Sequence, residues 1–331
     1  FNVYNNICYI NIFMYLIRTS IIFTFLLLLS IYAPYTAFLN HEPHIKDKVI
    51  YIEKGDTINE VFSSFLPLNF ANKLFLKIYS FTNDLDLFQS GEYEIGNKSI
   101  IDIIYLIKSG ETVTHKFKIN EGLTIYDIEN LINNSYLIND CSFLDCIDTN
   151  FSFKEGILYP DTYFYKKGMN ASEILKESHN RLENFLNNKL KNKVTDTLLS
   201  KEEILILASI IEKEAGNDQE KTTIASVFLK RLSIGMKLQA DPTIIYGLLP
   251  NFDGDIKKSD ILNKNNKYNT YMINGLPPTP ISISSISSIN ASIDSIPGEY
   301  LFFVADSPTS HYFSKTYEEH LNKINQLGLN K

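Results

Sequence analysis

The segment Ile204–Ile211 is an almost unbroken run of apolar residues with polar residues on both sides. Ser200 precedes it, and Glu203 follows that serine by three residues, which is the pattern of a capping box at the start of a helix. Gly216 lies where such a helix would stop. Because a helix that is apolar on nearly every side is a buried one, this segment predicts the central helix of a folded domain.

Two carboxylates, Glu212 and Glu214, end this predicted helix. Residues two apart on a helix do not share a face, so one of them should point into a site and the other elsewhere. Both lie in the last turn, where the helix dipole is negative, and burial acts in the same direction, so we expect a raised pKa for each. A raised pKa suits a general acid. The alternative is a helix-terminal Glu that only caps or pairs with a lysine.

The residues after this helix carry further recognisable blocks. The helical spacing of IASVFLKRL predicts a second helix that begins near Asn217 or Asp218 and runs up to Gly235. The blocks ASIIEKE, ASVFLKRLSIGMKLQADPTIIYG, YNTY and GLPPTPI follow one another in this order. Together they resemble the endolytic murein transglycosylases, the membrane-anchored family called MltG or YceG-like, which cut the glycan strands of peptidoglycan.

The resemblance implies a lytic transglycosylase, a lyase that works with one carboxylate. The sequence shows no metal cluster, phosphate loop or dinucleotide fingerprint, so we expect no cofactor. The family motif places that carboxylate on the second Glu of EKE, which is Glu214. As an acid it would protonate the glycosidic oxygen between N-acetylmuramic acid and N-acetylglucosamine. As a base it would then take the proton of the muramic C6 hydroxyl, which closes a 1,6-anhydro ring. The positions that match family blocks around the cleft, and are expected to contact substrate, are Gln239, Asp241, Tyr246, Asn269 and Tyr271.

Other functions remain open. A two-carboxylate muramidase would use Glu214 as acid, with Asp161 or Asp241 assisting water. A membrane-tethered glycan-binding or scaffold protein would need no activity at all. The net charge of −7 argues against a nucleic-acid partner. Contact with the peptidoglycan synthesis machinery is implied by the resemblance alone.

A second apolar run, Ser20–Leu39, is close to the ~20 residues that a helix needs to cross a bilayer. Arg18 before it and the charged residues after it give a weak orientation signal. The alternative is a cleaved signal peptide with Ile21–Tyr32 as its apolar core, but no small-residue cleavage site follows, so we favour an uncleaved anchor. Residues 1–19 would then lie on the cytoplasmic side, with Met14 as a conventional start for such an anchor.

The rest of the chain predicts a mixed α+β protein. The resemblance implies one N-terminal anchor in the plasma (inner) membrane and, on the extracytoplasmic or periplasmic side, a LysM-like module (46–115) followed by the catalytic domain (116–331). The residues themselves predict strands at 49–52 and 91–95 and a helix at 100–107. The KGDT turn after the first strand resembles the opening of LysM-type glycan-binding modules. A small spacer domain is the alternative.

Several shorter segments carry weaker structural signals. The serine-rich stretch 281–295 has isoleucines at roughly helical spacing and predicts a surface helix, YNTY predicts a strand, and 301–306 predicts a buried strand. Cys141 and Cys146 lie in a polar segment, where a disulfide and two unpaired thiols are equally plausible.

Overall fold

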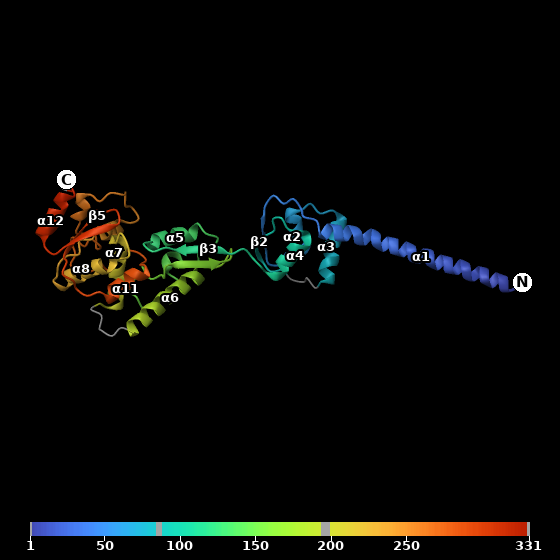
Figure 1. Cartoon of the computed structure of the whole chain (residues 1–331), viewed down its shortest axis with the longest axis horizontal. Coiled ribbons are helices and arrows are strands. Elements are labelled where there is room, and N and C mark those ends of the chain that lie inside the picture. Colours follow the sequence, from blue (N-terminus) through green and yellow to red (C-terminus); the bar gives the residue numbers. More distant parts are fainter. Residues whose placement is uncertain (1, 84–87, 193–198, 330–331) are drawn as a thin grey trace. The chain divides into compact units, whose positions relative to one another are not determined.

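The computed structural model describes residues 2–83, 88–192 and 199–329 of the 331-residue chain. The chain divides into two compact units, Phe1–Thr114 and His115–Lys331. Both contain helices and short antiparallel strand pairs, so the mixed α+β class is confirmed (Figure 1).

Unit 1 begins with one long helix and continues as a small α+β module. Within the long helix, Phe13–Leu39 is long and apolar enough to cross a membrane. Strands β1 and β2 pair antiparallel, with Val49 opposite Glu94. The elements of unit 1 are α1 (Asn2–Leu39), β1 (Val49–Ile52), α2 (Ile58–Phe65), α3 (Phe70–Thr82), β2 (Gly91–Glu94) and α4 (Ile100–Ser109).

The core of unit 1 includes the C-terminal end of α1. Leu39 is buried in the same apolar cluster as Phe62 and Leu76, and the His41 carbonyl accepts a hydrogen bond from Ile100 N at 3.1 Å. The predicted strands are confirmed, and α4 ends at Ser109, where Gly110 caps it in the left-handed conformation. Helix α1 is therefore joined to the module by packing as well as by chain connectivity.

Unit 2 is built around three mutually packed helices, α7, α8 and α11. Its strands form two antiparallel pairs, β3 with β4 and β5 with β6. The elements of unit 2 are β3 (His115–Ile119), α5 (Ile125–Asn133), the 3-10 helix η1 (Ser142–Leu144), β4 (Asp161–Tyr165), α6 (Ala171–Lys191), α7 (Lys201–Glu214), α8 (Lys221–Ser233), α9 (Asp241–Leu248), α10 (Lys258–Ile261), α11 (Ile286–Asp294), β5 (Phe302–Ser307), β6 (Ser310–Ser314) and α12 (Tyr317–Gln326).

Helix α7 is the predicted central helix. The capping box at Ser200 and Glu203 is present, and every residue from Ile204 to Ile211 is buried. The helix ends at Glu214, but Gly216 does not act as a left-handed cap: the cap residue is Ala215, in an extended conformation. A Cβ on Gly216 would instead lie 2.8 Å from the Thr309 carbonyl, so this glycine allows the β5–β6 turn to approach the end of α7.

Four local predictions are wrong. Helix α8 begins at Lys221, later than expected, because the Asn217 side chain accepts hydrogen bonds from the next backbone N–H groups and holds a turn. Helix α11 is not a surface helix, since Ser288, Ile289 and Ile293 are buried between α7 and α8. The YNTY segment forms turns and no strand. Strand β5 is partly exposed over its first half and exposed over its second.

Candidate active site

A cavity of about 330 Å³ lies at the C-terminal end of α7. It is bounded by α8, by the segment leading into α9, by strand β5 and by α12. Acidic, basic and aromatic side chains share its wall. The lining residues are Glu214, Arg231, Gln239, Asp241, Tyr271, Phe302, Phe303, Val304, Ala305, His311, Tyr317 and His320.

Glu214 is the last residue of α7 and is partly exposed, through this cavity. Burial raises the pKa of its carboxyl to about 8; the nearby negative charge of Asp241 acts in the same direction, and the Arg231 guanidinium opposes it. Among the residues that the structure describes, no hydrogen bond or ion pair holds this carboxyl. At a pKa of about 8, roughly nine in ten such groups carry their proton at pH 7.

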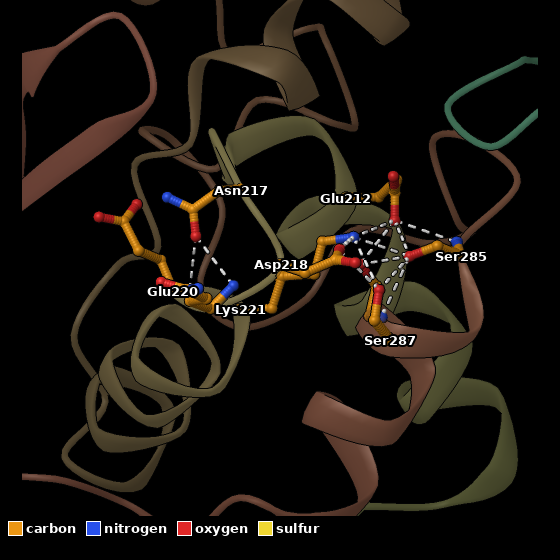
Figure 2. A network of polar contacts seen from close by, with 9 residues as sticks. Glu212, Asn217, Asp218, Glu220, Lys221, Ser285 and Ser287 are labelled. Atoms are coloured by element: carbon orange, nitrogen blue, oxygen red, sulfur yellow. Dashed lines mark hydrogen bonds and ion pairs between the residues drawn. The ribbon is translucent and has the colours of Figure 1, made fainter.

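Glu212 points the other way, into the polar network shown in Figure 2. Its Oε2 accepts hydrogen bonds from Ser285 N at 3.0 Å, from Ser288 Oγ at 2.6 Å and from the Ser285 hydroxyl. Lys221 Nζ lies 3.2 Å from the same oxygen. Burial alone would raise the pKa of Glu212, but these serine hydrogen bonds and the lysine charge lower it. The expectation of a raised pKa is therefore correct for Glu214 and wrong for Glu212.

The hydrogen bonds and ion pair of Glu212 join the C-terminal end of α7 to the N-terminal ends of α8 and α11. Ser285 is the N-cap of α11, and Lys221 opens α8. The Lys221 ammonium is buried, donates to the hydroxyls of Ser285 and Ser287, and forms an ion pair with Asp218 at 2.7 Å (Figure 2). These contacts hold the last turn of α7, the turn from which Glu214 projects.

Three of the five predicted substrate contacts line the cavity with Glu214: Gln239, Asp241 and Tyr271. The Tyr271 hydroxyl donates a hydrogen bond to Asp241 Oδ1 at 2.7 Å, which joins two of them. Gln239 has a φ of 50°, an uncommon value for a residue other than glycine, and its backbone N donates to the Thr270 carbonyl at 3.2 Å. Its conformation is thus held by the segment that carries Tyr271.

The other two lie outside the cavity wall. Asn269 is fully buried, and its Nδ2 donates to the carbonyls of Asp260, Ile261 and Asn263, each at 3.0 Å. Its Oδ1 accepts from Tyr271 N at 3.0 Å, so Asn269 fixes the loop before Tyr271. Asn269 and Tyr246 do not line the cavity. Their contact with substrate stays a prediction.

Tyr246 meets a buried carboxyl. Its hydroxyl donates to Glu155 Oε2 at 2.9 Å, and its ring packs edge-on against Tyr268. Glu155 also accepts a hydrogen bond from Ile125 N at 2.9 Å. Burial raises the pKa of Glu155 to about 7, against the opposing effect of these hydrogen bonds. This pair joins α9, which begins at the cavity with Asp241, to the start of α5.

Arg231 is the most informative lining residue that the sequence did not single out. Its Nε donates to the Leu301 carbonyl at 2.8 Å and its Nη1 to the Leu238 carbonyl at 2.5 Å. The guanidinium also lies over the Phe302 ring, 5.6 Å from its centroid. A signal was present, because Arg231 stands three residues after the buried Phe228 and therefore on the apolar face of α8.

The remaining lining residues come from the C-terminal hairpin and α12. A lone histidine such as His311 is more often structural than catalytic, but His311 does line the cavity, and its Nδ1 lies 2.9 Å from Glu220 Oε2. Tyr317 and His320 are three residues apart on one face of α12 and both contact the Phe302 ring. Among the described residues, no group of His, Cys, Asp and Glu side chains is arranged to hold a metal ion.

Comparisons with known proteins identify the family of this chain. The model of the YceG-like family matches residues 50–326, and the chain belongs to that family. It is 35% identical over 171 residues, 50% of this chain and 46% of the relative, to the endolytic murein transglycosylase of Bacillus subtilis strain 168. It is 29% identical over 170 residues, 50% of this chain and 31% of the relative, to the endolytic murein transglycosylase of Streptococcus pneumoniae strain D39.

A solved structure shows the same fold. The crystal structure of a YceG-like protein from Listeria monocytogenes superposes with a TM-score of 0.53 at 28% sequence identity, covering 83% of this chain and 98% of that one. The resemblance deduced from the sequence blocks is thereby confirmed. The matched region spans less than half of the length of the two curated relatives, at 46% and 31%.

Proposed function

We propose that this chain is an endolytic lytic transglycosylase of peptidoglycan. The observation that carries the proposal is Glu214, a carboxyl whose pKa is raised to about 8 and which faces a cavity of about 330 Å³. Two relatives named endolytic murein transglycosylase support it. A carboxyl that is protonated at neutral pH and free of hydrogen bonds to the described residues is ready to give its proton to a substrate.

The reaction uses this carboxyl twice. Glu214 gives its proton to the glycosidic oxygen between N-acetylmuramic acid and N-acetylglucosamine as the bond from that oxygen to muramic C1 breaks. The resulting carboxylate takes the proton of the muramic C6 hydroxyl, whose oxygen bonds to C1 and closes the 1,6-anhydro ring. The enzyme regains its proton and no water is consumed. Because the nucleophile belongs to the substrate, its attack is intramolecular and favoured by proximity.

The electrostatic surroundings suit both steps. Burial and the charge of Asp241 favour the protonated form before the first step. Once the proton has left, the same surroundings make Glu214 a stronger base than an exposed carboxylate, and the Arg231 charge stabilises the transient anion. Gln239, Asp241 and Tyr271 would hold the sugars in the cavity through hydrogen bonds, and the exposed ring of Tyr317 would offer a face to a sugar.

A two-carboxylate muramidase is the second candidate, and one of its two forms has structural support. Asp161, at the start of β4, forms an ion pair with Arg181 of α6 at 2.7 Å and does not line the cavity. Asp241 does line it. Water activated by Asp241 would leave a reducing muramic acid end where the transglycosylase leaves an anhydro end.

The setting of the enzyme is part of the proposal. Helix α1 would anchor the chain in the plasma membrane, as a single pass, with unit 2 outside the cytoplasm. The disulfide between Cys141 and Cys146, with Cα atoms 5.0 Å apart, supports an oxidising compartment. Segment 46–115 would bind glycan as a LysM-like module, and 116–331 would carry catalysis on the peptidoglycan strand. Contact with the synthesis machinery fits that location.

Mass spectrometry of peptidoglycan digested by the detergent-solubilised full chain tests the activity. Wild type should release fragments with 1,6-anhydro ends, and Glu214→Gln should reduce their release by a factor of roughly 100 or more. Glu177→Gln, an exposed change on α6, is the matched control and should act as wild type. Reducing muramic acid ends would instead support the two-carboxylate enzyme, and no cleavage by wild type would refute both.

A further inference from the structure

Helix α3 of unit 1 exposes a continuous apolar stripe. Phe70 is 84% exposed and Phe81 is 86% exposed, with Leu74 and Ile78 between them at 45% and 39%. These four residues stand at i, i+4, i+8 and i+11, so they share one face of the helix. The opposite face supplies Leu76 and Tyr79 to the core of the unit. Four large apolar side chains in one row are more than the scattered surface residues of a soluble module.

The stripe lies beside the membrane-spanning helix. The Phe75 ring packs against Tyr35 at 5.6 Å and against Phe38 at 6.0 Å, measured between centroids. Phe75 and Ile78 of α3 also line an apolar groove with six residues of α1, namely Phe25, Leu28, Leu29, Ile31, Tyr32 and Tyr35. In Figure 1, α3 lies beside the C-terminal part of α1 and runs across its direction. A helix that runs across a membrane span lies roughly along the membrane plane.

The contact falls at the depth of the membrane surface. The apolar segment Phe13–Leu39 has 27 residues, which as a helix is ~40 Å long, whereas the hydrocarbon core is ~30 Å thick. Its last turns therefore reach the headgroup region. Tyr32, Tyr35 and Phe38 are the aromatic residues of those turns, and aromatic side chains concentrate at that depth. Because α3 touches these same aromatics, it lies at the same depth.

Two lysines on α3 match the charge of a lipid surface. Lys73 and Lys77 are exposed and flank one edge of the stripe. Their long stems allow the ammonium groups to reach phosphate while the neighbouring rings enter the acyl region. An amphipathic helix with aromatic residues on one face and lysines beside them is typical of segments that lie in the interface of membranes with anionic lipids.

We propose that α3 is an interfacial helix whose apolar stripe and lysines bind the anionic leaflet next to the span. The inference rests on the proposed anchoring of α1 in the membrane. The stripe at Phe70, Leu74, Ile78 and Phe81 enters the boundary between headgroups and acyl chains, and the lysines bind lipid phosphate. Unit 1 is then held against the bilayer at two places, the end of α1 and the length of α3.

The absence of tryptophan from the sequence makes this directly measurable. The full chain carrying Phe81→Trp is reconstituted in vesicles of phosphatidylcholine and phosphatidylglycerol, with and without brominated acyl chains. We expect blue-shifted emission and loss of at least half of the intensity with brominated lipid. Tyr105→Trp is the control in the same unit, because Tyr105 interacts with Tyr79 on the opposite face of α3. Its emission should stay unquenched.

A third probe separates this inference from the anchoring on which it rests. Leu26→Trp, within α1, should be quenched if the helix spans the bilayer. Quenching of Leu26→Trp without quenching of Phe81→Trp would overturn the interfacial role and leave the anchor intact. A Leu26→Trp signal unaffected by brominated lipid would overturn both. Blue-shifted but unquenched emission from Phe81→Trp would show that protein covers the stripe, which also overturns the proposal.

The lysines are tested in the Phe81→Trp background. The double substitution Lys73→Glu and Lys77→Glu should reduce the quenching at position 81 by about half in anionic vesicles, because it reverses the attraction to lipid phosphate. The quenching of Leu26→Trp should not change. Equal quenching at position 81 with and without the lysines would overturn their assignment to the lipid surface.

Discussion

Glu212 and Glu214, two residues apart in the last turn of α7, have pKa values shifted in opposite directions. Serine hydrogen bonds and Lys221 lower the pKa of Glu212, whereas burial raises that of Glu214 to about 8. The helix supplies both carboxyls from one short sequence and turns them to opposite sides. One becomes a fixed anion that holds the helix end, and the other an acid that faces the cavity.

The activity should fall at alkaline pH. The proposed first step needs the protonated form of Glu214, and that form is lost as the pH rises through its pKa of about 8. We expect kcat/KM for glycan cleavage to decrease about tenfold per pH unit above that value. Release of anhydro-ended fragments at a series of pH values measures it. A decline that begins near pH 5 would contradict a raised pKa in the free enzyme.

Replacing the proposed acid should stabilise the fold. Because the pKa of Glu214 is raised from 4.5 to about 8, the native state binds more protons than the unfolded state between these values, and stability falls as the pH rises across that window. Glu214→Gln removes this penalty, so its free energy of unfolding at pH 8 should exceed that of wild type by roughly 1–3 kcal/mol.

Denaturant unfolding at pH 8 and at pH 5 measures that effect. The stabilisation by Glu214→Gln should shrink toward zero at pH 5, where wild-type Glu214 is protonated in the native state. A gain of the same size at both pH values would mean that packing, and not ionisation, is its cause.

The disulfide should make a modest contribution to stability. Cys141 and Cys146 close a short loop next to η1, and loop-entropy arguments for a loop of this length give roughly 2 kcal/mol. The double substitution to serine should lower the free energy of unfolding by that amount and leave cleavage unchanged. Equal unfolding midpoints with and without reductant would show that the bridge adds nothing.

Local signals were enough to predict the central helix. The capping box at Ser200 and the apolar run that follows act within a few residues of each other, so the sequence alone defines where α7 begins and that it is buried. The prediction of a surface helix around Ser288 was wrong because a serine-rich composition is typical of a surface. Here the hydroxyl of Ser288 is buried, and its partner is Glu212, 76 residues away in the sequence.

The candidate site was predicted through resemblance and only partly through physics. The resemblance to family blocks predicts substrate contacts at both Asn269 and Asp241. In the structure, Asn269 donates hydrogen bonds to backbone carbonyls, whereas Asp241 lines the cavity. Arg231 was missed because a charged residue in an amphipathic helix usually faces solvent. Its burial depends on the Leu301 and Leu238 carbonyls, which arrive from other parts of the fold.

Breaking the Glu212 network should unfold the site. Glu212→Ala leaves the buried ammonium of Lys221 and the hydroxyls of Ser285 and Ser288 without their shared acceptor. Because Lys221 keeps its ion pair with Asp218, we expect a loss of roughly 1–3 kcal/mol in the free energy of unfolding, together with reduced cleavage. Since the pKa of Glu212 is lowered, its contribution is present above its unfolded pKa and is lost as the pH falls through the folded value.

Urea unfolding of wild type, Glu212→Ala and Glu212→Gln measures this at neutral pH. The glutamine variant keeps an acceptor oxygen for the serines and should lose less than the alanine variant. If both variants unfold at the same urea concentration as wild type, the network does not stabilise the end of α7.

Asp241 decides between the two proposed chemistries. In the transglycosylase its charge raises the pKa of Glu214 and its carboxylate accepts the Tyr271 hydroxyl at 2.7 Å. Asp241→Asn should therefore lower kcat/KM by about 10-fold to 50-fold and move the alkaline decline to lower pH, because one source of the raised pKa is removed. The products should keep their anhydro ends.

In a two-carboxylate muramidase the same substitution removes the base that activates water, and activity should fall by a factor of roughly 1,000 or more. Tyr271→Phe is the matched control, since it removes the same hydrogen bond from the other side and leaves the Asp241 charge in place. A pH profile shifted by Asp241→Asn and not by Tyr271→Phe, with anhydro products from both, would assign Asp241 to the electrostatics of Glu214. If Asp241→Asn abolishes all cleavage and Tyr271→Phe does not, Asp241 is the base that activates water.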